Sequence, residues 1–131
     1  MTKNIEQQIT VEATSSEVFE ALIDQAKHAK FTGEPAKISR RAGGAFSCYD
    51  DYITGVTLEI VPSKRIVQAW RSRNWPKGVY SIVTFELSKT SGGRTKLSFS
   101  QIGVPANDYK EKSGGWKSHY WQPLKRFLEK R

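Results

Sequence analysis

Apolar and polar residues alternate near the start of the chain. Ile5, Ile9 and Val11 share one parity within residues 4–12, and polar residues stand between them. In an extended segment, side chains two residues apart point to the same face. The alternation therefore predicts a first β-strand with one buried face.

A helix-start motif follows this strand. Residues 14–17, Thr-Ser-Ser-Glu, have the form of a capping box, in which the Thr hydroxyl and the Glu carboxylate each bond a free amide of the first turn. The next apolar residues recur at helical spacing and give the helix one apolar face: Val18, Phe19, Leu22 and Ile23. A second short helix is expected from Asp24 to about Phe31, ended by Gly33 and Pro35.

The middle of the chain consists of short β-prone runs separated by turn residues. We expect strands near residues 36–41, 44–49, 52–61, 65–73, 79–88 and 94–102. Every connection between them is short, whereas a parallel pair needs a crossover of a dozen or more residues. The pattern predicts an antiparallel meander.

The last segment has the pattern of a long amphipathic helix. Residues 108–111, Asp-Tyr-Lys-Glu, form a second predicted capping box. Its apolar face is broad and aromatic, and it comprises Trp116, Tyr120, Trp121, Leu124, Phe127 and Leu128. Gly114 and Gly115 weaken the helix and Pro123 removes one backbone donor, so a bend or break is predicted between residues 114 and 123.

This order of elements is that of a helix-grip fold. It predicts an α+β domain in which an antiparallel sheet of six to seven strands wraps around a long C-terminal helix, with two short helices after the first strand. A length of 131 residues suits one hydrophobic core, so residues 1–131 are interpreted as a single domain.

Composition narrows the class of protein. Hydrophobic residues make up 37% of the chain and charged residues 26%, which favours a folded domain over a disordered one. Neither a signal peptide nor an apolar run long enough for a membrane span is visible. Cys48 is the only cysteine, which excludes an intrachain disulfide and a cysteine-based metal site. A cytoplasmic location is expected.

The formal net charge of +8 biases the surface toward anionic partners. The basic residues are dispersed, with no block of five or more, so a solvating basic surface is favoured over a nucleic-acid interface. The segment from Trp70 to Trp75, with Arg71 and Arg73, is the one aromatic-basic cluster that suits base stacking. No nucleic-acid partner is predicted.

The sequence offers no catalytic or metal-binding constellation. His28 and His119 are the only histidines, and neither stands at a metal-ligand spacing. Asp50 and Asp51 are adjacent in a predicted turn, whereas acid–base carboxylates are held apart across a cleft. Cys48 has no histidine near it in sequence and is interpreted as a buried or cavity-lining thiol. We predict no catalytic residue, no metal and no cofactor.

Several collinear motifs resemble one known family. They include Gly-Gly-Ala-Phe at 43–46, the run from Tyr52 to Arg71, Trp-Pro-Lys-Gly at 75–78 and Gln-Ile-Gly-Val-Pro at 101–105. These resemble the activator of heat-shock protein 90 ATPase-like family, and the chain is similar to the C-terminal domain of its eukaryotic members. The resemblance implies a helix-grip fold with a cavity between the sheet and the long helix, without naming a ligand.

Strand parity and the helix face together predict the lining of that cavity. The candidate residues are Gln68, Trp70, Ser81, Val83, Phe85, Leu97, Phe99, Gln101, Trp116, Tyr120 and Trp121. The same side chains would serve equally to fill a core, and the resemblance favours a cavity. Gln68, Ser81, Gln101 and Tyr120 are the candidate groups that orient a ligand.

Two functions are expected from this reasoning. The first is a non-enzymatic domain that binds a small hydrophobic or amphipathic ligand. The alternative is a co-factor of a heat-shock protein 90-type chaperone or a stress-response interaction module, which the resemblance and the basic surface favour. A cyclase-like activity in the cavity is permitted by the fold, but no residue supports it. The oligomeric state is not predicted.

Overall fold

The computed structural model describes residues 1–129 and contains one seven-stranded sheet and a set of helices. The strands are β1 (Thr2–Val11), β2 (Ala36–Ile38), β3 (Ala45–Cys48), β4 (Ile53–Val61), β5 (Arg65–Ser72), β6 (Ser81–Thr90) and β7 (Arg94–Pro105). The helices are α1 (Ser15–Ile23), α2 (Gln25–Thr32), α3 (Tyr109–Gly115) and α4 (Gln122–Glu129), with the π-helical segment Trp116–Trp121 between the last two. Short 3-10 turns lie at Ser91–Gly93 and Ala106–Asp108.

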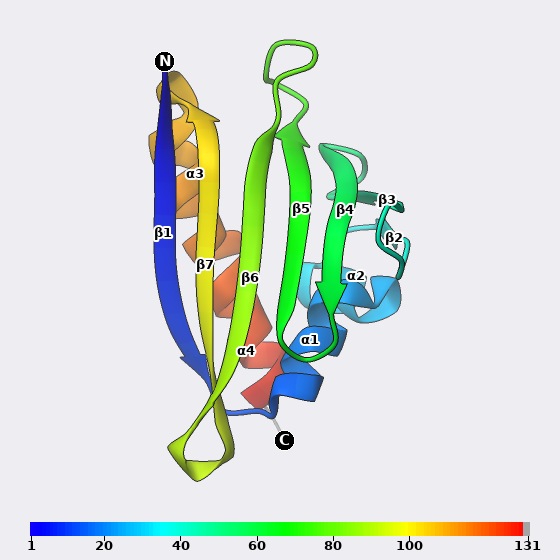
Figure 1. Ribbon diagram of the computed structural model, residues 1–131, viewed down its shortest axis with the longest axis vertical. Coiled ribbons are helices and arrows are strands. Elements are labelled where there is room, and N and C mark those ends of the chain that lie inside the picture. The colour runs from blue at the N-terminus through cyan, green and yellow to red at the C-terminus, as the bar shows by residue number, and fades with distance from the viewer. Residues whose placement is uncertain (130–131) are drawn as a thin grey trace.

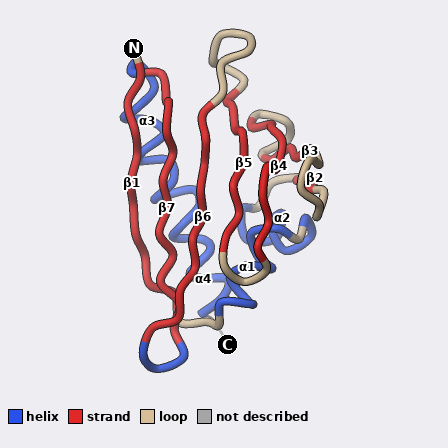
Figure 2. The backbone as a smooth tube through the Cα atoms, in the orientation of Figure 1, coloured by secondary structure: helices blue, strands red, loops and turns tan. Residues whose placement is uncertain are grey.

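The sheet is antiparallel throughout, in the order β1-β7-β6-β5-β4-β3-β2. Strands β2 to β7 form the predicted meander, and β1 joins the free edge of β7. The C-terminal helix crosses one face of the sheet, and α1 and α2 lie beside it, as Figure 1 and the backbone trace in Figure 2 show. The predicted α+β helix-grip fold is confirmed.

The predicted start of α1 and end of α2 are confirmed. The Thr14 hydroxyl accepts from the Glu17 amide at 3.1 Å, and the Glu17 carboxylate accepts from the Thr14 amide at 2.9 Å. Helix α2 ends at Gly33, which has a φ of +78° and lies in the left-handed region that glycine adopts at low cost.

The C-terminal helix differs from the sequence-based prediction in two respects. Asp108 occupies the cap position of α3 but its side chain makes no capping hydrogen bond, so the second capping box is wrong. Of the predicted bend or break, the break is wrong, because the helical path continues from α3 to α4, and a π-helical segment interrupts the regular α-helix within the predicted range (Figure 1). There the Gln122 amide bonds the Lys117 carbonyl, five residues back.

Strand parity places the core as expected. In β5 every second side chain from Ile66 to Ser72 is buried, and β6 and β7 bury alternate side chains in the same way toward the helix. Aromatic rings of the sheet and helix pack together, with Phe99 and Trp116 at 4.3 Å between centroids. Within residues 1–129, no helix is long and apolar enough to cross a membrane.

Candidate functional site

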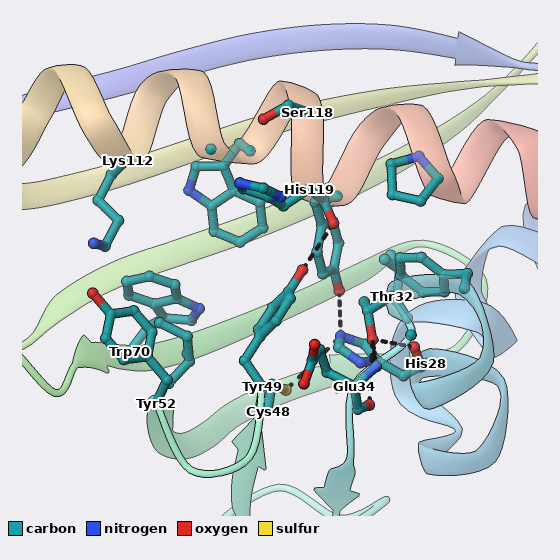
Figure 3. Close-up of a pocket in the computed structure, with 18 of the residues that line it drawn as sticks. His28, Thr32, Glu34, Cys48, Tyr49, Tyr52, Trp70, Lys112, Ser118 and His119 are labelled. Atoms are coloured by element: carbon teal, nitrogen blue, oxygen red, sulfur yellow. Dashed lines mark hydrogen bonds between the residues drawn. The ribbon is translucent and has the colours of Figure 1, made fainter.

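A pocket with a volume of about 920 Å³ lies between α2, the turn that joins β3 to β4, and the C-terminal helix (Figure 3). Small-molecule sites occupy roughly 300–1,000 Å³, so the volume suits a ligand of that class. Its wall is more apolar than polar and includes eight aromatic side chains: Phe31, Phe46, Tyr49, Tyr52, Trp70, Phe85, Trp116 and Tyr120. The pocket is therefore a mainly apolar chamber in a domain whose sheet and helix are otherwise closely packed.

The predicted cavity residues divide into two groups. Five of them line the pocket: Gln68, Trp70, Phe85, Trp116 and Tyr120. The other six are buried in the core without lining it: Ser81, Val83, Leu97, Phe99, Gln101 and Trp121. The chamber thus lies toward the β3–β4 side of the sheet, and the helix packs directly on β6 and β7.

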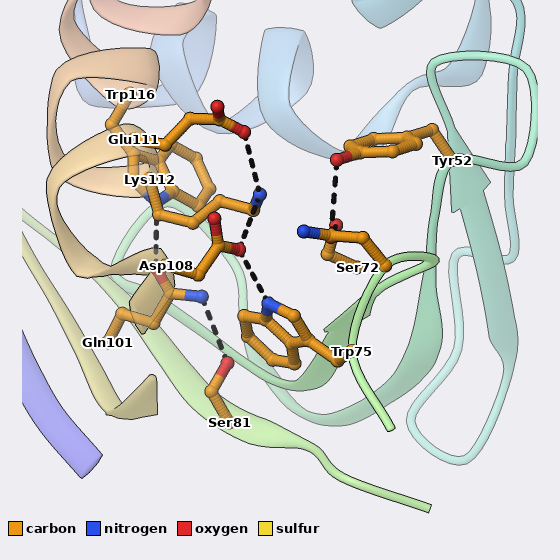
Figure 4. A network of polar contacts seen from close by, with 10 residues as sticks. Tyr52, Ser72, Trp75, Ser81, Gln101, Asp108, Glu111, Lys112 and Trp116 are labelled. Carbon is orange, nitrogen blue, oxygen red and sulfur yellow. Dashed lines mark hydrogen bonds and ion pairs between the residues drawn. The ribbon is translucent and has the colours of Figure 1, made fainter. Parts of the chain in front are cut away.

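Gln101 and Ser81, two of the residues predicted to orient a ligand, form hydrogen bonds within the protein. The Trp116 indole donates to Gln101 Oε1 at 2.8 Å, and Gln101 Nε2 donates to Ser81 Oγ at 2.9 Å (Figure 4). Ser81 Oγ in turn donates to the Trp70 carbonyl at 3.0 Å. These hydrogen bonds fix the helix to β7, β6 and β5 and leave neither Gln101 nor Ser81 free for a ligand.

His28 and Tyr120 form a buried pair at the wall of the pocket. His28 Nε2 lies 2.9 Å from Tyr120 Oη and 3.8 Å from Cys48 Sγ (Figure 3). Burial lowers the pKa of His28 to about 4 and raises the pKa of the Cys48 thiol to about 12. Burial also raises the pKa of Tyr120 well above its ordinary value. All three groups are therefore neutral at pH 7.

Pro123 explains a contact across the pocket. Proline has no amide hydrogen, so the carbonyl of His119, four residues earlier, has no partner on the helix from that position. Tyr49 Oη instead donates to this carbonyl at 2.9 Å (Figure 3). Tyr49, Asp50 and Asp51 all have positive φ angles, so the turn that presents Tyr49 is strained. The turn is thereby tied to the C-terminal helix.

A buried ion pair closes the pocket end near α3. The Asp108 carboxylate accepts from the Trp75 indole at 2.7 Å and from Lys112 Nζ at 2.8 Å (Figure 4). Burial raises the pKa of the Asp108 carboxyl, but the hydrogen bonds from Lys112 and Trp75 outweigh burial and the net pKa is lowered. The carboxylate that was predicted to cap α3 anchors the Trp75 loop instead.

The other charged residues around the pocket are exposed. Lys30, Lys110 and Arg126 are basic, whereas Glu34 and Glu111 are acidic. These charges therefore lie at the solvent side of the chamber, and the one buried cation of its wall, Lys112, is paired with Asp108. Among residues 1–129, no group of three or more His, Cys, Asp and Glu side chains is arranged to hold a metal ion.

The aromatic-basic cluster of the sequence does not form a stacking surface. Trp70 and Trp75 are both buried, with 6% and 5% of their surface exposed, and their rings pack together at 5.6 Å. Base stacking needs an accessible ring face. The Arg71 guanidinium bonds the Trp75 carbonyl at 2.8 Å and so holds the loop rather than facing solvent alone.

Sequence reasoning missed the α2 side of the pocket. His28 was considered only as a metal ligand, and Phe31 and Tyr49 were not singled out. Phe31 stands four residues before Pro35 in a weakly amphipathic helix, and the sequence gives no sign of which element that helix faces. The only available signal was the aromatic content of residues 28–31 and 49–52.

Curated relatives match most of this chain. An uncharacterized protein of Schizosaccharomyces pombe is 30% identical over 124 residues, which cover 95% of this chain and 37% of that protein. The Dictyostelium discoideum protein named activator of 90 kDa heat shock protein ATPase homolog is 29% identical over 95% of this chain and 32% of its own length. The human homolog 1 of that activator is 29% identical over 83% and 32%. The chain spans about a third of the length of these relatives.

Solved structures share the fold over nearly the full chain. An Hsp90 activator from Plasmodium falciparum has a TM-score of 0.91 at 24% identity, over 96% of both chains. The Aha1 dimer from Colwellia psychrerythraea has a TM-score of 0.84 at 16% identity, over 97% of this chain and 96% of that one. The model of the family described as activator of Hsp90 ATPase homolog 1-like protein matches residues 12–129. The chain belongs to this family.

Proposed function

We propose that this domain is a non-enzymatic binding module whose pocket receives a small hydrophobic or amphipathic ligand. The observation that carries the proposal is the chamber of about 920 Å³, whose wall includes eight Phe, Tyr and Trp side chains and is bounded by exposed charges. An apolar interior favours burial of an apolar ligand body, at about 25 cal/mol per Å² of apolar surface removed from water. The exposed charges at the rim suit a polar end.

The state of the ionisable groups supports binding over catalysis. A nucleophilic cysteine needs a lowered pKa, whereas burial raises the pKa of Cys48 to about 12. A general base needs a pKa near the working pH, whereas that of His28 is lowered to about 4. These groups shape the wall and carry no charge at neutral pH.

A matched pair of substitutions tests the pocket. Ile53 lines the chamber and Leu97 is fully buried away from it. We expect Ile53→Trp to project into open volume, to leave the melting temperature nearly unchanged and to abolish ligand binding. Leu97→Trp overfills a close-packed site and is expected to destabilise the protein by about 1–3 kcal/mol.

Binding is measured as the rise in melting temperature with a panel of fatty acids and naphthalene derivatives, because a ligand that binds only the folded state stabilises it. The proposal predicts a concentration-dependent rise for the native protein and none for Ile53→Trp. If no hydrophobic compound stabilises the native protein, or if both substitutions destabilise it equally, the chamber does not function as a binding site.

A second candidate function rests on the named relatives. Two of the curated proteins described above are named as activators of the 90 kDa heat shock protein ATPase. We propose an Hsp90-type chaperone as a protein partner, with the net charge of +8 supporting contact with an acidic face. A pull-down with the purified chaperone should recover a complex that weakens as salt rises from 50 to 500 mM, since exposed charges are then screened. Failure to recover the chaperone at the lowest salt would remove this candidate.

A further inference from the structure

Gln68 differs from every other polar residue predicted to orient a ligand. It lies in β5, near the middle of the sheet, where it is paired in register with Thr57 of β4 and Val83 of β6. Only 8% of its surface is exposed, and it lines the pocket. Among the described residues, no group forms a hydrogen bond with its side-chain amide, whereas Ser81, Gln101 and Tyr120 are all bonded within the protein.

The side-chain amide of Gln68 faces the pocket and has no hydrogen-bond partner in the described part of the chain. A buried donor or acceptor that loses its bonds to water must find others, and native proteins leave few such groups unsatisfied. Thr57, the partner of Gln68 on the neighbouring strand, has a hydroxyl that is buried without a hydrogen-bond partner in the described part of the chain. One region of the sheet thus holds two donors and an acceptor on Gln68, with a hydroxyl beside them.

The surroundings of Gln68 carry no charge. His28, Cys48 and Tyr120 are neutral because they are buried. The one buried cation of the pocket wall, Lys112, is paired with Asp108 at 2.8 Å. The remaining charged side chains of the wall are exposed. An ion pushed toward Gln68 would lose its hydration without meeting a free opposite charge.

We propose that the pocket selects a largely apolar ligand whose buried end carries a neutral hydroxyl or carbonyl group, and that this group is bound by the side-chain amide of Gln68. The inference rests on the proposed binding function and adds the chemistry of the buried end of the ligand. The side chain of Gln68 then serves ligand recognition and is not required for the fold.

Three probes of the same ring size test this selection. 2-Naphthol carries a neutral hydroxyl, 2-methylnaphthalene carries a methyl group of similar size, and 2-naphthoate carries a negative charge. Their affinities are measured by titration calorimetry with the native protein and with Gln68→Met, which keeps the length of the side chain and removes its amide. Gln122→Met is the control, because Gln122 is exposed on α4.

The native protein should bind 2-naphthol about five- to tenfold more tightly than 2-methylnaphthalene, the ratio that one net hydrogen bond provides. In Gln68→Met this preference should disappear while the affinity for 2-methylnaphthalene is retained or improved. Gln122→Met should behave as the native protein. Without any ligand, Gln68→Met should melt at the same or a higher temperature, because the substitution removes no hydrogen bond within the protein and adds apolar surface to the wall of the pocket.

The outcomes separate this inference from the proposed function. Equal affinities for 2-naphthol and 2-methylnaphthalene in the native protein would overturn the role of Gln68 and leave the binding function intact. Tightest binding of 2-naphthoate would overturn the neutral buried end. A fall of several degrees in the melting temperature of ligand-free Gln68→Met would show that Gln68 supports the fold. Absence of binding by all three probes would overturn both proposals.

Discussion

Acidification should destabilise this protein through a single histidine. His28 is 2% exposed, and burial lowers its pKa from 6.5 to about 4 in the folded state. The unfolded chain, with a pKa near 6.5, binds the proton first as pH falls. Stability is therefore complete above about pH 6.5 and is lost progressively as pH falls toward 4, because protonation favours the unfolded chain.

The size of the stability loss follows from the pKa shift of His28. Each pKa unit corresponds to about 1.4 kcal/mol, so a shift from 6.5 to about 4 represents roughly 3 kcal/mol in total, of which about 2.5 kcal/mol is lost by pH 4.5. The free energy of unfolding is measured by urea denaturation between pH 7.5 and 4.5, a window above most carboxyl pKa values. The His28→Gln variant keeps an amide near Tyr120 but does not titrate.

The variant should be less stable than the native protein at pH 7.5 and should show a much flatter dependence on pH. His119→Gln is the matched control, because His119 is exposed and its removal should leave the native slope unchanged. If His28→Gln loses as much stability as the native protein between pH 7.5 and 4.5, burial of His28 is not the cause and the reasoning is wrong.

Other substitutions test the fold around the pocket by urea denaturation. A Cβ on Gly55 would lie 1.9 Å from the carbonyl oxygen of Ala69, so Gly55→Ala should destabilise the protein by about 3 kcal/mol or more, whereas Gly114→Ala, with open space around it, should stabilise α3 by up to about 1 kcal/mol. A loss of stability in Gly114→Ala comparable to that in Gly55→Ala would contradict the assigned packing. Asp108→Asn should lower stability by about 3 kcal/mol because it leaves the buried Lys112 with only the more distant Glu111 carboxylate, at 3.9 Å, and adding Lys112→Met should restore most of the loss. Additive losses in that double variant would show that the two side chains do not interact.

Periodicity predicted the architecture because it records which face of each element is buried. The alternation in Ile5, Ile9 and Val11 places the first strand, and the three- and four-residue steps from Trp116 to Leu128 place the helix that covers the sheet. Strand parity put Gln68 on the same face as Trp70, and both side chains are buried. These features depend on local pattern, which the sequence carries directly.

Features that depend on distant partners were not predictable in the same way. The sequence around Asp108 has the form of a capping box, but its carboxylate pairs with the indole of Trp75, 33 residues earlier. Pro123 predicts a lost hydrogen bond, yet the sequence does not show that a π-helical segment continues the helix or that Tyr49 bonds the freed carbonyl of His119. The part of the pocket wall that α2 forms depends likewise on a distant contact, because α2 lines the pocket together with the C-terminal helix.

The central claim is that the chamber binds a small hydrophobic or amphipathic ligand. Native mass spectrometry tests it most directly, with the purified protein measured before and after incubation with a mixed extract of lipids and metabolites. The account predicts a discrete added mass on the native protein and on Gln122→Met, and none on Ile53→Trp, which fills the chamber. An unchanged mass for the native protein across the extract would contradict the account and would favour a role through protein contacts alone.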